Sequence, residues 1–510
     1  MSLRAEGWGW RYASRSDWAC QDISFEIQPG EKVLLLGASG SGKSTLLRAV
    51  AGVLGGADEG DEVGRLLVDG VHPSRLRGRV GLVMQDPQSQ LILSRLGDDV
   101  AFGLENLRVP TEQIWPLVDA SLAAVGLGEL PRDHATAQLS GGQQQRLAIA
   151  GALAMFAVQN ANAAPAVLCL DEPTANLDPV GVREVRDTIV NLAAQQPDVT
   201  LLIVEHRVDI WADVVDRVIV LAAARDGGGV IADGPPAEVL TKHVALLTEA
   251  GIWVPGVPAP GARRELSAPS STILHSEQLS TGYRAEQPIS TDLDVQIPAG
   301  RSTVITGPNG AGKSTLAMTM AGLLPPLAGR VVAAEQLRPA AEEARRGLWR
   351  RRRKRDVSSP HAWTSRELLT RLGTVFQHPE HQFVESSVRA ELAVGLKALG
   401  RPEAQIVKRT DELLARMRLT QLADANPFTL SGGEQRRLSV ATVLATSPAV
   451  VFLDEPTFGQ DRNTWAELVA MISELLAKDV TIVSVTHDAQ YLDVLGEHHI
   501  RLNPAGEVSL

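Results

Sequence analysis

Two glycine-rich loops that end in lysine and serine carry the clearest chemistry in this sequence. Each fits the pattern G-x-x-x-x-G-K-[ST], in which glycines let backbone N–H groups converge on phosphate oxygens. The lysine would neutralise β- and γ-phosphate charge, and the serine hydroxyl would ligate Mg²⁺. The two lysines lie 270 positions apart (313 − 43). The loop residues predicted to bind nucleotide are Gly37, Ser39, Gly40, Gly42, Lys43, Ser44, Thr45, Gly307, Asn309, Gly310, Gly312, Lys313, Ser314 and Thr315.

An acidic pair follows an apolar run in each half of the chain. Asp171-Glu172 comes after residues 166–170, and Asp454-Glu455 comes after residues 450–453. An Asp-Glu pair alone is usually a surface feature, but its place after an apolar strand, with Pro-Thr next in both copies, favours a functional interpretation. The aspartate suits hydrated Mg²⁺, and the glutamate suits polarising a water beside the γ-phosphate. We predict catalytic bases at Glu172 and Glu455, and metal ligands at Ser44, Asp171, Ser314 and Asp454.

A histidine closes a further apolar run in each half. His206 and His487 follow the two glutamates by 34 and 32 residues (206 − 172; 487 − 455). A lone histidine is more often structural than catalytic, yet two in equivalent register are better explained as sensors of the γ-phosphate. We predict that both hold the glutamate and the attacking water in line.

The tetrapeptide Leu-Ser-Gly-Gly opens a helical, basic stretch in each half, at residues 139–142 and 430–433. A serine and two glycines at a helix N-terminus form an anion site. One nucleotide already has its own phosphate loop, so a second anion site per half implies that two domains share nucleotides across an interface. The nucleotide-binding residues predicted here are Ser140, Gly142, Ser431 and Gly433.

The elements that must position these groups are short apolar strands alternating with helical stretches. The strands are expected at residues 33–36, 166–170, 201–204, 304–305, 450–453 and 481–485. Continuous apolar runs are typical of buried parallel strands, whose carboxyl ends meet at the sheet edge where ligands bind. The fold class is therefore predicted as α/β, with two tandem P-loop NTPase domains that each contain a mainly parallel sheet covered by helices.

The duplication predicts a first domain at residues 1–248, a linker at 249–271 and a second domain at 272–510. The linker is rich in proline and glycine and lacks helical periodicity. The second half also carries a basic insertion at residues 345–355, which is either a solvated loop or a contact with anionic lipid headgroups.

Net charge, cysteine count and hydropathy limit which partners and sites are expected. The net charge is −11, so no nucleic-acid-binding surface is expected. Cys20 and Cys169 are the two cysteines, which is too few for a disulfide scaffold or a cysteine zinc cluster. The sequence holds no run of about 18 apolar residues, so a role at a membrane would depend on a membrane-embedded partner.

With these motifs in place, nearly all of both halves resembles the ATP-binding-cassette (ABC) ATPases. The resemblance implies a helical subdomain carrying LSGG and a head-to-tail sandwich, with Lys43 paired to Ser431 and Lys313 to Ser140. It implies ATP and Mg²⁺ as ligands. The linker permits pairing inside one chain, and the complementary, non-identical halves favour it over pairing between two chains. The resemblance also implies that Tyr12 and Tyr283 stack on adenine, with Trp10 as an alternative to Tyr12. Gln85 and Gln377 match the glutamine that meets Mg²⁺ and the attacking water beside a transmembrane partner.

The residues after Gln85 narrow the resemblance further. Residues 86–90 (DPQSQ) and 98–106 (DDVAFGLEN) are similar to ATPases of energy-coupling-factor importers, which take up vitamins or transition-metal ions. This implies a peripheral ATPase at the cytoplasmic face of the cell membrane. Its expected partners are a transmembrane coupling subunit and a small substrate-binding membrane protein.

Two other classes compete with the importer. A soluble tandem ATPase acting on ribosomes would usually carry a long charged helical linker between its domains. A DNA-repair ATPase would need long heptads or cysteine zinc sites. The two halves also differ near the nucleotide, for example Glu434 against Gln143, so two competent sites of unequal rate are expected.

Overall fold

The computed structural model describes residues 1–510 except 14, 39, 55–58, 77–78, 88, 159–166, 176, 265–269, 341–355, 458, 504–507 and 510. Two compact units are present. The first comprises Met1–Pro258 with Gly459–Asn463, and the second Ala259–Phe458 with Thr464–Leu510. Each is described below by itself. Ser39 and the basic insertion at 345–355 lie outside the described residues.

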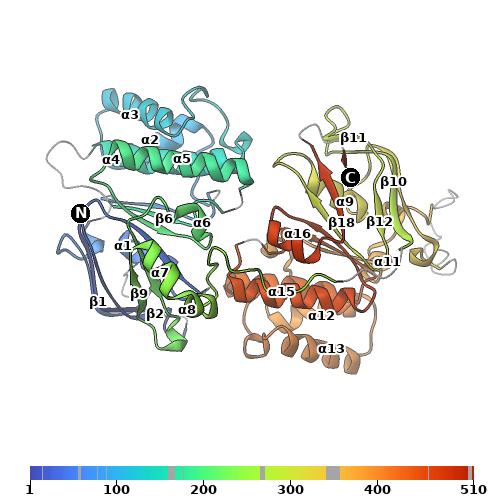
Figure 1. Ribbon diagram of the computed structural model, residues 1–510. Coiled ribbons are helices and arrows are strands. Elements are labelled where there is room, and N and C mark those ends of the chain that lie inside the picture. Colours follow the sequence, from blue (N-terminus) through green and yellow to red (C-terminus); the bar gives the residue numbers. More distant parts are fainter. Residues whose placement is uncertain are drawn as a thin grey trace. The chain divides into compact units, whose positions relative to one another are not determined.

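The first unit is built on a six-stranded sheet of order β5-β6-β7-β3-β8-β9, parallel except for its last strand (Figure 1). A three-stranded antiparallel sheet, β2-β1-β4, accompanies it. The strands are β1 Leu3–Tyr12, β2 Cys20–Ile27, β3 Lys32–Gly37, β4 Gly60–Val68, β5 Val80–Val83, β6 Val167–Asp171, β7 Thr200–Val204, β8 Arg217–Leu221 and β9 Val230–Gly234.

Helices of the first unit cover this sheet and form a separate subdomain. They are α1 Lys43–Val50, α2 Leu96–Asn106, α3 Thr111–Ala124, α4 Gly141–Val158, α5 Pro179–Gln195, α6 Val208–Trp211, α7 Pro236–Lys242 and α8 Val244–Glu249. Helix α4, which begins at the LSGG motif, packs on α2 and α3. The motif therefore lies on a helical subdomain.

The second unit repeats the plan. Its six-stranded sheet has the order β15-β16-β17-β13-β18-β19, and β10 pairs with β11, β12 and β14. The strands are β10 Thr272–Thr281, β11 Ser290–Leu293, β12 Gln296–Pro298, β13 Ser302–Thr306, β14 Ala328–Ala333, β15 Leu372–Val375, β16 Val450–Asp454, β17 Thr481–Val485, β18 His498–Leu502 and β19 Val508–Ser509. The helices are α9 Lys313–Met320, α11 Ser365–Leu369, α12 Val388–Ala398, α13 Glu403–Arg416, α14 Gly432–Ala445, α15 Arg462–Leu476 and α16 Ala489–Leu495.

The central sheet of the first unit separates two apolar cores. On β3, Leu34 and Leu36 pack into the core shared with α2–α5. Val33 and Leu35 pack into the core shared with α1 and the antiparallel sheet. Successive side chains of a strand point to opposite faces, so a strand buried on both faces must be apolar throughout. The predicted fold class, with mainly parallel sheets covered by helices, is confirmed.

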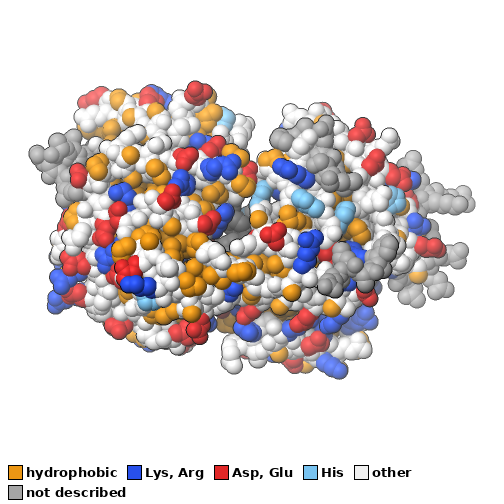
Figure 2. Space-filling view, in the orientation of Figure 1, with side chains coloured by type: hydrophobic (Ala, Val, Ile, Leu, Met, Phe, Trp, Pro, Cys, Tyr) orange, Lys and Arg blue, Asp and Glu red, His pale blue; other side chains and the backbone are white. Residues whose placement is uncertain are grey.

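The surface is mixed in character. Figure 2 shows acidic and basic side chains interspersed on the visible face of each unit. On that face of the first unit, apolar side chains gather around α7 and α8.

Candidate functional site

The phosphate loop of the first unit joins β3 to α1. Gly42 caps α1 in the left-handed conformation, with φ 85°, and a Cβ there would lie 2.5 Å from Cys20 Cβ. Lys43 is buried and its Nζ donates to the carbonyls of Gly37 at 2.7 Å and Ala38 at 2.9 Å. Burial lowers the pKa of this lysine. The ammonium is thus held inside the loop whose N–H groups would receive phosphate.

The loop of the second unit has the same construction. Gly312 caps α9 with φ 86°, and Lys313 Nζ donates to the carbonyls of Gly307 at 2.8 Å and Pro308 at 3.0 Å. Gly40 and Gly310 have φ 80° and 81°. The two loops therefore place lysine, serine and glycine in matching positions, and their nucleotide-binding roles remain predictions.

A hydroxyl and a carboxylate meet where the Mg²⁺ is predicted. Ser44 Oγ donates to Asp171 Oδ1 at 3.1 Å, and Ser314 bonds Asp454. Burial, with the charge of Glu172, raises the pKa of Asp171 to about 6, and burial raises the pKa of Asp454. Asp454 Oδ1 is buried and has no hydrogen-bond partner within the described residues. Hydroxyl and carboxylate oxygens are the ligands that Mg²⁺ prefers, so both sets fit this ion.

Glu172 is held by two side chains. Gln85 Nε2 donates to its Oε2 at 2.7 Å, and His206 Nε2 lies 2.9 Å from its Oε1. Burial alone would raise the pKa of Glu172, but His206, Lys43 and Gln85 together lower it. Three predicted residues, Lys43, Gln85 and His206, thus favour the ionised form of the Glu172 carboxylate.

Glu455 has different contacts: the Thr486 side chain bonds its carboxylate, and the His487 N–H donates to its Oε2 at 3.4 Å. His487 Nε2 lies 3.8 Å from Glu455 Oε1 and 3.1 Å from Asn309 Oδ1. Among the described residues, no hydrogen bond joins Gln377 to Glu455. Burial, followed by the charge of Asp454, raises the pKa of Glu455 to about 7. The second unit therefore holds its glutamate differently from the first.

Both glutamates occupy a strained backbone position. Each has φ 47°, in the left-handed region that a non-glycine residue rarely adopts. The Glu172 N–H donates to Val204 O at 2.9 Å, and the Glu455 N–H to Val485 O at 2.8 Å. Such strain clusters at functional sites, because the surrounding structure must enforce it.

The two predicted adenine-stacking residues differ in exposure. Tyr12 is half-buried, and its hydroxyl lies 3.2 Å from Thr45 Oγ1. Tyr283 is 66% exposed. Thr315 is buried at the position that corresponds to Thr45.

The LSGG serines lie exposed at helix N-termini. In the first unit Ser140 Oγ accepts from the Gln143 N–H at 3.3 Å, and in the second unit Ser431 forms a capping box with Glu434. Gly142 is buried and Gly433 half-buried. Neither serine hydrogen-bonds the phosphate loop of its own unit in the described part of the chain.

Two buried charged residues near Glu172 and Glu455 were not predicted from the sequence. Glu205, directly before His206, accepts hydrogen bonds from the His206 N–H at 2.8 Å and from the Thr174 hydroxyl. Arg436 in α14 donates to the Glu455 carbonyl at 2.7 Å. Glu205 could have been found from the sequence, because it is a charged residue directly after the apolar run at residues 201–204. For Arg436 the signal was its difference from Gln145 in the other half.

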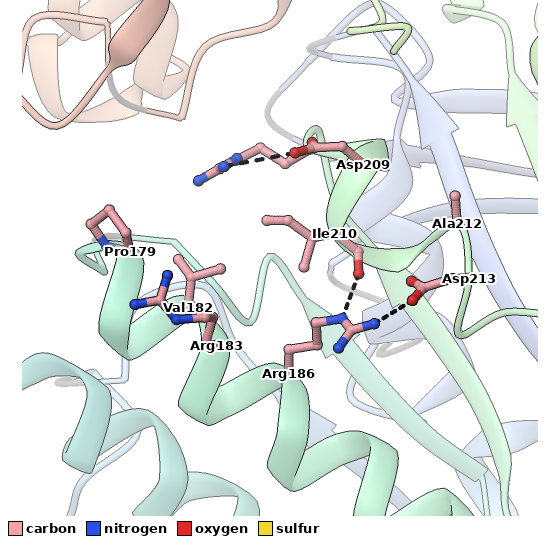
Figure 3. A pocket seen from close by; sticks show the side chains of 9 residues that line it. Pro179, Val182, Arg183, Arg186, Asp209, Ile210, Ala212 and Asp213 are labelled. Atoms are coloured by element: carbon pink, nitrogen blue, oxygen red, sulfur yellow. Dashed lines mark hydrogen bonds and ion pairs between the residues drawn. The ribbon is translucent and has the colours of Figure 1, made fainter.

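A pocket of about 370 Å³ opens on the first unit beside α5 and α6 (Figure 3). None of the predicted nucleotide residues lines it. Arg186 crosses the space from α5 to donate to Ile210 O at 2.9 Å and to pair with Asp213 at 2.5 Å. The lining residues are Pro179, Val182, Arg183, Arg186, Arg207, Asp209, Ile210, Ala212 and Asp213.

The order of loop, LSGG helix and acidic strand in both units corresponds to a known family. The family model described as ABC transporter matches residues 20–175 and 290–458, more than half of the chain. The chain belongs to the ABC transporter family. It is thus an ABC ATPase, and domains of this family bind ATP, generally with Mg²⁺. The resemblance to ABC ATPases that the sequence motifs indicated is confirmed.

Similar proteins extend over both units. A putative HMP/thiamine import ATP-binding protein of Bacillus subtilis is 34% identical over 515 residues, covering 95% of this chain and 87% of the relative. A putative ABC transporter ATP-binding protein of Methanosarcina acetivorans is 33% identical over 541 residues, covering 96% of this chain and 82% of the relative.

Solved structures share the tandem fold. A model of ribosome-bound archaeal Pelota and ABCE1 matches with a TM-score of 0.63 and 19% identity, covering 97% of this chain and 76% of that chain. At this identity the likeness shows the fold alone. Within the described residues, no helix combines the length and the apolar character that crossing a membrane requires.

Proposed function

We propose that this ABC ATPase powers an importer of the energy-coupling-factor type, for a vitamin or a transition-metal ion. The observation that carries the proposal is the 34% identity, over 95% of the chain, to a protein named as an HMP/thiamine import ATPase. The importer-like residues 86–90 and 98–106 agree with it. The chain would act peripherally at the cytoplasmic face of the membrane, with a transmembrane coupling subunit and a small substrate-binding membrane protein as partners.

In this proposal, the predicted site residues of the first unit have distinct roles in ATP hydrolysis. Loop N–H groups and Lys43 bind the β- and γ-phosphates. Ser44 and Asp171 would hold Mg²⁺, which would supply positive charge to neutralise the phosphate oxygens. Glu172 takes a proton from water as the water oxygen attacks the γ-phosphorus, and the bond from that phosphorus to the bridging oxygen breaks to release ADP. His206 and Gln85 orient Glu172, whose ionised state suits a base.

The second unit offers the same series through Lys313, Ser314, Asp454, Glu455 and His487. The LSGG serines cap helices outside their own phosphate loops, so each is available to another nucleotide. We propose, as the motifs predict, that Ser431 completes the site of Lys43 and that Ser140 completes the site of Lys313.

The test is a pull-down of tagged protein from gently solubilised native membranes, with the Glu172→Gln/Glu455→Gln double variant run in parallel. Recovery of a polytopic membrane subunit together with a small membrane protein is expected with both proteins, and ATP turnover only with the wild type. Recovery of ribosomes in place of membrane proteins would overturn the transport assignment. Full turnover by the double variant would overturn the catalytic assignment.

A further inference from the structure

A buried arginine connects three functional segments of the second unit. Arg436 lies on α14 and is 6% exposed. Its guanidinium donates to the carbonyls of Glu455 at 2.7 Å, Phe376 at 3.0 Å and Asp454 at 3.5 Å. Phe376 directly precedes Gln377, and α14 begins at the LSGG motif. One side chain thus joins the LSGG helix to the predicted glutamine and glutamate segments.

The arginine remains a cation in this position. Burial lowers the pKa of Arg436 to about 10, and the nearby charges of Glu455, Asp454 and Glu380 oppose this effect. A buried ion must be compensated by hydrogen bonds and opposite charge, or it costs several kcal/mol. Three carbonyls supply that compensation. Their geometry matches a planar guanidinium, which presents several donors in a fixed fork.

Among the described residues of the first unit, no side chain of the LSGG helix makes this connection. Gln145 occupies the same place, five residues after its LSGG serine (145 − 140; 436 − 431). It is 1% exposed, and its Nε2 has no hydrogen-bond partner in the part of the chain that the structure describes. There the carbonyl of Glu172 accepts from the Ala175 N–H at 3.0 Å.

The two units therefore hold their glutamates by different means. In the first unit, Gln85 and His206 contact the carboxylate itself at 2.7 Å and 2.9 Å. In the second unit the Thr486 side chain and the His487 N–H bond the carboxylate, and the His487 ring lies 3.8 Å away. There Arg436 also contacts the glutamate carbonyl. That carbonyl belongs to a residue with φ 47°, so the bond stabilises a strained backbone.

We propose that Arg436 is a positioning residue for hydrolysis in the second unit. It fixes the backbone of Glu455 and makes the LSGG helix and the Gln377 segment move together with that glutamate. The inference rests on the proposed role of Glu455 as catalytic base.

The experiment isolates the second site in a Glu172→Gln background. There Arg436→Gln and Arg436→Lys are compared with Arg437→Gln, a matched control whose arginine donates to Met417 O at 3.1 Å in the helical subdomain. We expect Arg436→Gln to lower kcat at least tenfold with the KM for ATP changed less than twofold, and Arg436→Lys to lower kcat by a smaller factor. Arg437→Gln should leave both within twofold.

Turnover is normalised to the stoichiometry of bound nucleotide, so a loss of folded protein does not count as a loss of kcat. If Arg436→Gln does not fold, Arg436→Lys keeps the buried charge and carries the test. A kcat within twofold of the parent for the folded variants would overturn the inference, as would an equal loss in Arg437→Gln. Adding Glu455→Gln to the same background must abolish turnover, since otherwise it is the proposed role of Glu455 that fails.

Discussion

Glu172 and Glu455 directly follow equivalent strands and share a φ of 47°, yet the surroundings shift their pKa values in opposite directions. The pKa of Glu172 is lowered, so its ionised form stabilises the folded state above the ordinary pKa of a glutamate. The pKa of Glu455 is raised to about 7, so raising the pH from about 4.5 to above 7 costs folding stability. Glutamine carries no charge and responds to neither effect.

We therefore predict opposite effects of the two Glu→Gln substitutions on the nucleotide-free protein at pH 8. Glu455→Gln should stabilise its unit by about 1–3 kcal/mol, which is about 2–4 °C in Tm per kcal/mol, and the gain should shrink at pH 6. Glu172→Gln should lower Tm at both pH values. Thermal scans at the two pH values measure this, and a Tm gain for Glu455→Gln that is the same at both would contradict the prediction.

The histidines should also differ in their contribution. His206 lies within hydrogen-bond distance of its glutamate at 2.9 Å, whereas His487 is 3.8 Å away. A hydrogen bond to a charged group contributes about 1.5–3 kcal/mol, or about 10–100-fold in rate. We predict that His206→Ala, measured with Glu455→Gln, loses 10–100-fold in turnover. His487→Ala, measured with Glu172→Gln, should lose less than tenfold, and equal losses would refute the difference.

The loop-to-helix junctions of α1 and α9 share a conformation but not their surroundings. Gly42 and Gly312 have φ 85° and 86°. A Cβ at Gly42 would meet Cys20 Cβ at 2.5 Å and the Ala19 carbonyl oxygen at 2.7 Å, whereas one at Gly312 would meet Ile289 Cγ2 at 2.7 Å. The backbone at Ala19 cannot move aside easily, but an isoleucine side chain can change rotamer.

Gly42→Ala should therefore destabilise its unit more than Gly312→Ala does. The left-handed conformation costs an alanine about 1–2 kcal/mol at either position, and overpacking adds about 1–3 kcal/mol at Gly42. Gly70→Ala is the matched control, because φ is 75° there and no atom lies within 4 Å of the added Cβ. Denaturant unfolding should rank the losses as Gly42, Gly312 and Gly70; a loss at Gly70 as large as at Gly42 would show that strain alone sets the cost.

The elements that sequence predicted best are the strands buried on both faces. Residues 201–204 and 481–485 lie in β7 and β17. A continuous apolar run is typical of a strand that is buried on both faces of a parallel sheet. The antiparallel sheet was not predicted. Its strand β1 pairs with β2 and β4 through register shifts, and such long-range pairing leaves no local periodicity. Glu205 and Arg436 were missed for a related reason, since Thr174, which bonds Glu205, and the carbonyls that Arg436 contacts lie far from them in the sequence.

The tandem chain as a whole joins two units whose glutamates, histidines and LSGG helices are not interchangeable. Glu172 has a lowered pKa and is contacted by Gln85 and His206, whereas Glu455 has a raised pKa and is bonded by Thr486, the His487 N–H and, through its carbonyl, Arg436. An ionised, oriented carboxylate is the better base.

We therefore predict that turnover at neutral pH is higher when only the first site is intact. Glu455→Gln should retain more of the wild-type rate than Glu172→Gln, by about threefold or more, because the raised pKa of Glu455 disfavours its ionised form at pH 7 and the His487 ring lies 3.8 Å away. Raising the pH to 8.5 should ionise Glu455 and so reduce the difference in turnover between the two variants. The orientation of Glu172 by His206 should not change, so part of the difference should persist. Steady-state phosphate release at both pH values decides the point, and identical residual turnover of the two variants at pH 7 would show that the sites are equivalent despite their different surroundings.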